Sequence, residues 1–304
     1  MYVAIHSRSR EPAALVARCR QVGVQHVCLA LQDLPGYAET GVPDPAYLRE
    51  LVTRLQDAGV AVPVAITWFG NDPDLVLNPA AHLREINAKL RTLEALAHAG
   101  IGVTLHYIDL AQSQNPDDDA RYWDGLIGVF RGIVAQAEAV NVRLANHAIW
   151  RCIPDGLRED ALRQGVRMDG YRWYRPAGWR GPYLLTDHSH LLRLLEAVPS
   201  VHNGVCFCTG MHIMGGDVPA LVDVFRGRIF YAQMRDVRGR WPAAEEVFLG
   251  EGDLDFAQIL RRLRAVGYSA AIGPEHLGRP RQPDGDLEAQ AVRFLQQTLA
   301  SLGA

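Results

Sequence analysis

Short apolar runs alternate with amphipathic helical stretches along this chain, and the alternation constrains its fold more than any other feature. A strict strand-helix alternation requires a parallel sheet with right-handed crossovers, because each helix must cover the strands beside it. Eight repeats favour closure of that sheet into a single (β/α)8 barrel. The runs predicted as strands are residues 2–7, 26–31, 61–68, 102–107, 143–149, 203–208, 229–235 and 270–275.

The helical stretches carry start and stop signals. Asp44 and Pro45 provide a cap and a first residue for one helix, and Gly59 ends it. An open, doubly wound sheet is the alternative, but no Gly-x-Gly-x-x-Gly turn follows the first strand. The predicted helices are residues 12–21, 45–58, 79–99, 119–140, 186–198, 217–225, 256–266 and 286–302.

The length fits one domain. A (β/α)8 barrel routinely occupies about 250 residues or more, and no break in composition divides residues 1–304. One long insertion interrupts the pattern at about 150–185, after the fifth strand. It contains tryptophans and arginines, and a loop of this length in a compact domain is usually functional or disordered. Its aromatic content argues against disorder, so we expect a lid or a contact in a homo-oligomer.

Composition excludes several classes of partner. The formal net charge is -3 and no block of basic residues is present, which gives no electrostatic reason for nucleic acid or an anionic membrane as partner. No run approaches the roughly 18 to 20 apolar residues of a membrane span, and the first residues do not resemble a signal peptide. Five cysteines without a paired framework agree with a reducing compartment. We therefore expect a cytoplasmic protein.

The predicted strand ends hold many ligating and proton-transferring side chains. Barrel active sites lie at the carboxyl ends of the strands. Side chains two apart on a strand face the same side, so Gln233 and Arg235 should both face the barrel mouth. The residues at these ends are Ser7 or Arg8, Gln32, Trp68, His106, His147, Cys208, Gln233 with Arg235, and Glu275 with His276.

Four of these residues form a mixed donor set. His147, Cys208, Gln233 and Glu275 together offer nitrogen, sulfur and oxygen atoms, which suits Mn, Co, Fe or Zn better than Ca or Mg. Taken singly, each residue has a simpler interpretation, because a strand-end histidine is commonly structural and a strand cysteine is usually a small core residue. Cys206 is interpreted in that way. The joint arrangement on strands five to eight favours a metal site.

At these residues the chain resembles a known family. The segment from Asn203 to Gly210 is similar to the Asn-Gly-…-Phe-Cys-Thr-Gly signature of the UxuA-type mannonate dehydratases, which belong to the xylose isomerase-like barrel superfamily. Residues 229–235 resemble a Tyr-Phe-x-His-Leu-Arg pattern of that family, and residues 273–276 resemble its Arg-Pro-Asp-His pattern. The resemblance extends from about residue 79 onward.

The resemblance implies a divalent metal, typically manganese, with Co²⁺, Fe²⁺ or Zn²⁺ as alternatives. It implies that His147 and Cys208 are ligands, with Gln233 where the family has a second histidine and Glu275 where it has an aspartate. The chain also departs from the family at residues 148–151, where Ala-Ile-Trp-Arg replaces an acidic Pro-Asp-Asp segment. Arg235 and His276 match the family in type.

The resemblance also implies a reaction, the removal of water from an aldonic acid through an enediolate-like intermediate. Arg235 is expected to bind the substrate carboxylate bidentately. His276 is the expected acid or base, with His106 or Tyr107 as second choice. Two alternatives remain open: a metal-dependent sugar isomerase or epimerase, and a non-catalytic protein that binds sugar acids. Further residues expected to contact the sugar or sugar acid are Trp68 and Arg8.

Overall fold

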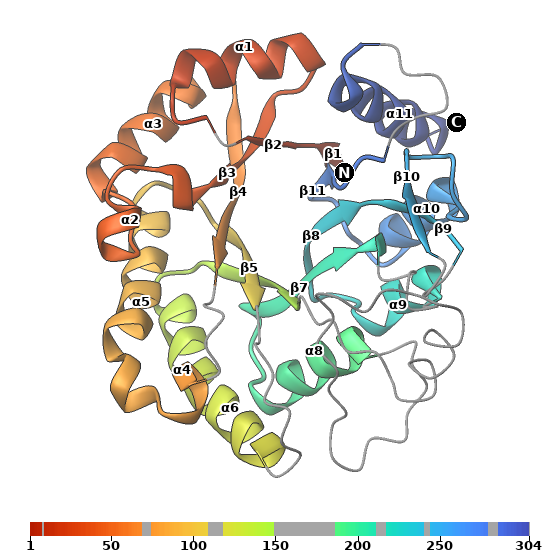
Figure 1. The fold of residues 1–304 in the computed structure, drawn as a ribbon. Coiled ribbons are helices and arrows are strands. Elements are labelled where there is room, and N and C mark those ends of the chain that lie inside the picture. The colour runs from red at the N-terminus through yellow and green to blue at the C-terminus, as the bar shows by residue number, and fades with distance from the viewer. Residues whose placement is uncertain are drawn as a thin grey trace.

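The computed structural model describes residues 1–7, 9–68, 74–108, 118–148, 186–210, 217–239, 244–278 and 285–303. Parallel strands form a central ring and helices surround it (Figure 1), which confirms the predicted barrel. The predicted insertion at 150–185 lies outside the described residues. The strands of the ring are β1 (Tyr2–Val3), β2 (Ile5–Ser7), β3 (His26–Ala30), β4 (Ala61–Trp68), β5 (Val103–Ile108), β6 (Arg143–Ala148), β7 (Asn203–Cys208), β8 (Ile229–Met234) and β11 (Ala271–Pro274).

The ring closes through the first predicted strand. Residues 2–7 form two short strands instead of one, and the strand order is β1-β11-β8-β7-β6-β5-β4-β3-β2. β1 pairs with β11 and β2 pairs with β3, so one segment joins both edges of the sheet. Between them the Ala4 amide donates to the Ile272 carbonyl at 2.9 Å.

The helices form the outer layer, and their apolar faces follow the predicted periodicity. In α3 the stripe of Leu48, Leu51, Val52 and Leu55 is buried, and Asp44 caps its first turn. The predicted helix at 79–99 begins instead as a 3-10 turn, η2, and is preceded by a short helix, α4. The helical elements are α1 (Pro12–Val22), η1 (Leu31–Asp33), α2 (Tyr37–Thr40), α3 (Pro45–Asp57), α4 (Asp74–Leu77), η2 (Pro79–His82), α5 (Leu83–His98), α6 (Asp118–Ala139), α8 (Thr186–Ala197), α9 (Val218–Val224), α10 (Phe256–Ala265) and α11 (Leu287–Ser301).

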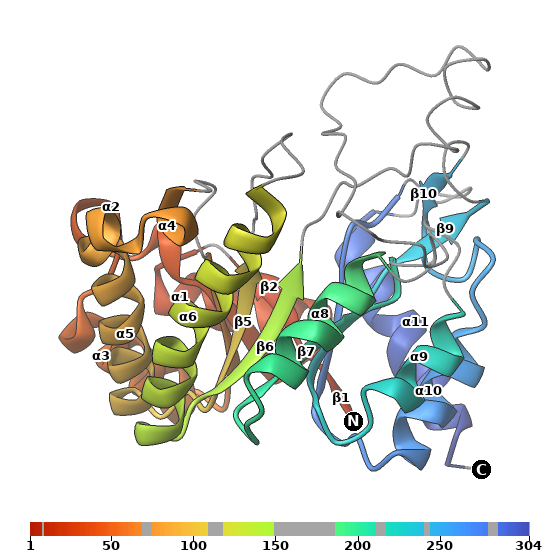
Figure 2. The same ribbon diagram turned by 90° about the horizontal axis from the view of Figure 1, so that it is seen from below.

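A hairpin that was not predicted lies at the barrel mouth. It consists of β9 (Asp236–Arg238) and β10 (Glu245–Val247), and Figure 2 shows it on the side toward which β5 and β6 run. Asp236 anchors it, because this buried carboxylate accepts hydrogen bonds from the backbone amides of Gly250 and Gly252, each at 2.9 Å. The hairpin is therefore held against the strand ends.

The first and last helices are joined by ion pairs. The Arg18 guanidinium of α1 contacts Asp286 and Glu288 at the start of α11, with Nη2 2.9 Å from Asp286 Oδ1 and Nε 2.8 Å from Glu288 Oε2. All three side chains are partly exposed, so each pair contributes on the order of 1 kcal/mol or less. Within the described part of the chain, no helix is long and apolar enough to cross a membrane.

Helix α6 carries glycines in two different environments, which allows a matched test of its packing. A methyl group at Gly125 would lie 1.9 Å from the backbone oxygen of Val76 in α4, whereas one at Gly132 would meet no atom of the described residues within 4 Å. We expect Gly125→Ala to lower the free energy of unfolding by about 3 kcal/mol and Gly132→Ala to raise it by about 1 kcal/mol. Urea denaturation measures both, and equal values would contradict the contact between α4 and α6.

Candidate metal centre

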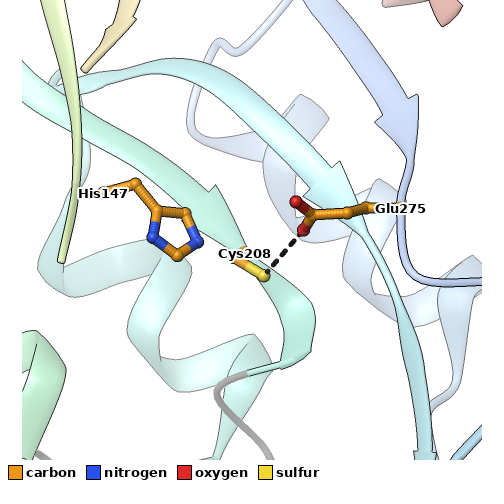
Figure 3. A group of neighbouring side chains, drawn as sticks. All are labelled: His147, Cys208 and Glu275. Atoms are coloured by element: carbon orange, nitrogen blue, oxygen red, sulfur yellow. Dashed lines mark hydrogen bonds between the residues drawn. The ribbon is translucent and has the colours of Figure 1, made fainter. Parts of the chain in front are cut away.

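Three side chains converge at the carboxyl ends of β6, β7 and β11, which lie on one side of the ring. His147 lies near the end of β6, Cys208 ends β7, and Glu275 directly follows β11. One ligand atom from each lies within 4.8 Å of the other two, and the side chains point toward one another (Figure 3). The Cys208 thiol donates to Glu275 Oε2 at 3.6 Å. The structure thus brings together three of the four residues expected as ligands.

The strand register explains this convergence. β6, β7, β8 and β11 are consecutive in the ring, so their ends share one side of the mouth. Cys208 is paired in register with Gln233 of β8. The Glu275 amide donates to the Met234 carbonyl at 2.9 Å and extends the pairing one residue past β11. The backbone therefore fixes the point on the barrel rim from which the Glu275 side chain extends.

Gln233 lies beside this cluster and is fully buried. Its Nε2 donates to Glu275 Oε1 at 2.7 Å, and its Oε1 accepts from the Cys206 thiol at 3.3 Å. Cys206 and Cys208 are two apart on β7, as expected for residues that face the same side. A chain of hydrogen bonds therefore runs from Cys206 through Gln233 and Glu275 to Cys208.

The donor atoms fit a divalent transition metal. Burial and the neighbouring Glu275 raise the pKa of Cys208 to about 12, so the group is a thiol whose proton lies against the carboxylate. A divalent cation between the two would replace that proton and neutralise both groups. Metal bonds of about 2.0 to 2.3 Å place ligand atoms roughly 3.3 to 3.8 Å apart. Small side-chain rotations would bring atoms within 4.8 Å to that spacing.

A second group of charged residues lies next to the cluster. Glu246 of β10 forms an ion pair with Arg235 and lies 3.2 Å, through Oε2, from His276 Nδ1. Arg235 passes over Gly210, where an added Cβ would lie only 2.5 Å from Arg235 Cδ. Burial and Arg235 lower the pKa of His276. Glu246 was not predicted from the sequence, because no strand signal marks its hairpin.

His106 is not brought to this cluster. Its Nδ1 lies 3.0 Å from Asn146 Oδ1, and its ring packs against Phe130 of α6 with centroids 5.6 Å apart. Burial and the nearby Lys89 lower the pKa of His106 to about 3. His106 therefore faces the helix layer, on the side of β5 opposite to the barrel interior, because its neighbour Leu105 belongs to the interior core.

Three other expected residues cannot be placed by their side chains. Trp68 ends β4 and Tyr107 lies in β5, where their backbones are paired with each other. The side chains of both fall outside the described residues, and so does Arg8 as a whole. Their expected contacts with substrate stay predictions.

Comparison with known proteins agrees with the fold. The sequence pattern of the xylose isomerase-like TIM barrel family matches residues 16–298. The chain belongs to this family. The expected superfamily is thus confirmed, and the relatives that this chain resembles in sequence include mannonate dehydratases.

Individual family members are distant in sequence. A mannonate dehydratase of Enterococcus faecalis is 26% identical over 167 residues, which cover 50% of this chain and 42% of that protein. The matched stretch is thus less than half of that relative. The crystal structure of mannonate dehydratase from Streptococcus suis serotype 2 superimposes with a TM-score of 0.72 at 17% identity, over 99% of this chain and 95% of the other.

Two further solved structures share the fold. L-ribulose 3-epimerase has a TM-score of 0.69 at 19% identity, over 100% of this chain and 96% of the other. The IolI protein, solved with a zinc atom bound, has a TM-score of 0.64 at 15% identity, over 99% of this chain and 98% of the other. At these identities the likeness concerns the barrel alone.

Proposed function

We propose that this chain is a metal-dependent enzyme that removes water from a small aldonic acid. The observation that carries the proposal is the convergence of His147, Cys208 and Glu275 at strand ends on one side of the barrel mouth. These three residues would hold the ion, most simply Mn²⁺ given the resemblance, with Co²⁺, Fe²⁺ or Zn²⁺ as alternatives. When bound, the ion supplies Lewis-acid stabilisation of the negative charge that develops on substrate oxygens.

The neighbouring residues provide the remaining functions. Arg235 binds the substrate carboxylate, since a guanidinium forms paired hydrogen bonds to it. His276 transfers a proton; its lowered pKa leaves the imidazole neutral near pH 7 and able to accept one. Glu246 contacts both side chains and so fixes their separation. An acidic substrate must share Arg235 with Glu246.

Elemental analysis and turnover test this function together. We expect close to one Mn, Co, Fe or Zn per chain, and conversion of an aldonic acid such as mannonate to a 2-keto-3-deoxy acid, followed by NMR of the product. The non-catalytic alternative, a protein that binds sugar acids, predicts no turnover. Protein that takes up no metal, even after reconstitution with each ion, would refute the proposal.

Isomerisation or epimerisation of a neutral sugar is the second candidate. It is favoured by the ion pair between Arg235 and Glu246, because the guanidinium already has a carboxylate partner and a neutral substrate need not displace it. L-ribulose 3-epimerase has the same barrel fold, so the fold is compatible with this reaction class but does not select it. Incubation with ketoses in D₂O separates the two: an epimerase incorporates deuterium at carbon and retains every hydroxyl group.

A further inference from the structure

The role of Gln233 can be deduced from the groups on either side of its amide. The Glu275 carboxylate lies at one end, 2.7 Å away, and the Cys206 thiol lies at the other, 3.3 Å away. An ionised carboxylate only accepts hydrogen bonds, whereas an amide has a donating and an accepting end. The end of Gln233 that faces Glu275 must therefore be the NH₂ group.

The identity of the atom at the other end of the Gln233 amide follows from the same reasoning. With Nε2 toward Glu275, Oε1 faces Cys206, whose S–H group donates to it. The reversed amide would direct oxygen against the carboxylate and lose that hydrogen bond, and its NH₂ group would face only the weakly accepting Cys206 sulfur, inside a fully buried side chain. The orientation of the Gln233 amide therefore follows from its hydrogen-bond partners and not from which of its two end atoms is labelled oxygen or nitrogen.

We propose that Gln233 is a positioning residue and not a metal ligand. The only atom that the amide could offer to a metal, Oε1, is held by Cys206, while Nε2 holds Glu275 through Oε1 and leaves Oε2 toward Cys208. Cys206 thereby gains a role beyond filling the core, since it fixes the amide that fixes the ligand. The inference rests on the proposed metal site, and it names the partner that orients one of its ligands.

Cobalt-substituted protein tests this assignment directly. Visible absorption reports the coordination number of Co²⁺ and the thiolate bond of Cys208, independently of activity. For Gln233→Leu we expect one Co²⁺ per chain, an unchanged d–d band pattern and a thiolate charge-transfer band, with affinity about 10- to 100-fold weaker. A Co²⁺-loaded Gln233→Leu protein with an altered d–d pattern, or a Gln233→Leu protein that binds no Co²⁺, as expected for Glu275→Ala, would mean that Gln233 is a ligand, and would overturn the proposal.

Variants of Cys206 provide the matched control. Cys206→Ser keeps a donor and should retain Co²⁺ affinity within a few fold. Cys206→Ala removes the donor and should weaken Co²⁺ binding, and the double variant Cys206→Ala/Gln233→Leu should be no weaker than Gln233→Leu alone, because both changes break one chain of hydrogen bonds. Additive losses would contradict the link between the two residues.

A metal-free measurement separates this inference from the proposed function. If the wild type binds no metal, the proposed function fails, but the contact between Gln233 and Glu275 is still tested by melting temperature. We expect Gln233→Leu to lower the melting temperature of the metal-free protein, and to lower it by less when Glu275 is already alanine. Equal decreases in both backgrounds would overturn the positioning role.

Discussion

Replacing Glu275 with alanine is expected to remove the bound metal and to lower turnover by about a thousandfold. Glu275 is the only acidic member of the cluster with His147 and Cys208 among the described residues. Without it the ion loses an anionic ligand, and Lewis-acid stabilisation worth several kcal/mol is lost with the ion. Elemental analysis of the purified variant and a turnover assay under the same conditions measure both effects.

Cys208→Ser and Glu245→Ala complete this test. The serine hydroxyl is a poor ligand for these ions, so we expect Cys208→Ser to lose metal and activity in parallel. Glu245 lies on β10 next to Glu246 but is exposed and pairs with Arg238 at 3.4 Å, so its removal should leave both unchanged. Stoichiometric metal and full activity in Glu275→Ala would refute its assignment as a ligand.

Replacing Lys89 with methionine is expected to stabilise the protein by about 3 kcal/mol at pH 7. Lys89 is the only lysine of the chain, and its Nζ is buried in the helix layer with no hydrogen-bond partner among the residues that the structure describes. Burial lowers the pKa of Lys89 to about 7, from 10.5. A tenfold change in a protonation equilibrium corresponds to about 1.4 kcal/mol, and methionine fills a similar space without this cost.

The effect should depend on pH in a defined direction. Between pH 10.5 and 7 the unfolded chain binds a proton at Lys89 that the folded chain does not, so folding becomes less favourable as the pH falls. Below about pH 7 the Lys89 amine is protonated in the folded chain too, and the loss of folding stability no longer changes with pH. The advantage of Lys89→Met should therefore be largest at and below pH 7 and should disappear toward pH 10.5.

The presence of a single lysine makes this measurement direct. Reductive methylation with ¹³C should give one side-chain resonance besides that of the amino terminus, and its titration reports the pKa of Lys89 in the methylated protein. Arg91→Met, at an exposed position of the same helix, is the control and should change stability by less than about 0.5 kcal/mol at any pH. A titration near pH 10 would show that the Lys89 amine is solvated.

Strand periodicity accounts for the part of the site that was predictable. Cys208, Gln233 and Glu275 follow apolar runs whose barrel arrangement brings their ends together, and the structure places them side by side. His106 was expected at the mouth because its strand was assigned to end near it. Its neighbour Leu105 faces the interior, however, and alternation directs His106 outward.

Other features depend on contacts between distant segments. Glu246 lies in a hairpin held by buried Asp236 and the amides of residues 250 and 252, and no local pattern marks this arrangement. The orientation of the Gln233 amide depends on Cys206, which has the ordinary appearance of a core residue. Such roles become visible only when the groups on both sides of a side chain are known.

The way the ring closes has a consequence for biosynthesis. β1 pairs with β11, and Arg18 forms ion pairs with Asp286 and Glu288, which follow it by 268 and 270 positions. A ribosome therefore exposes β1 well before its partner exists, and the barrel can be sealed only after residues 271–272 have emerged. Until then the unpaired edges of β1 and β8 are open to other nascent chains, so chaperone capture should be greatest just before β11 leaves the exit tunnel.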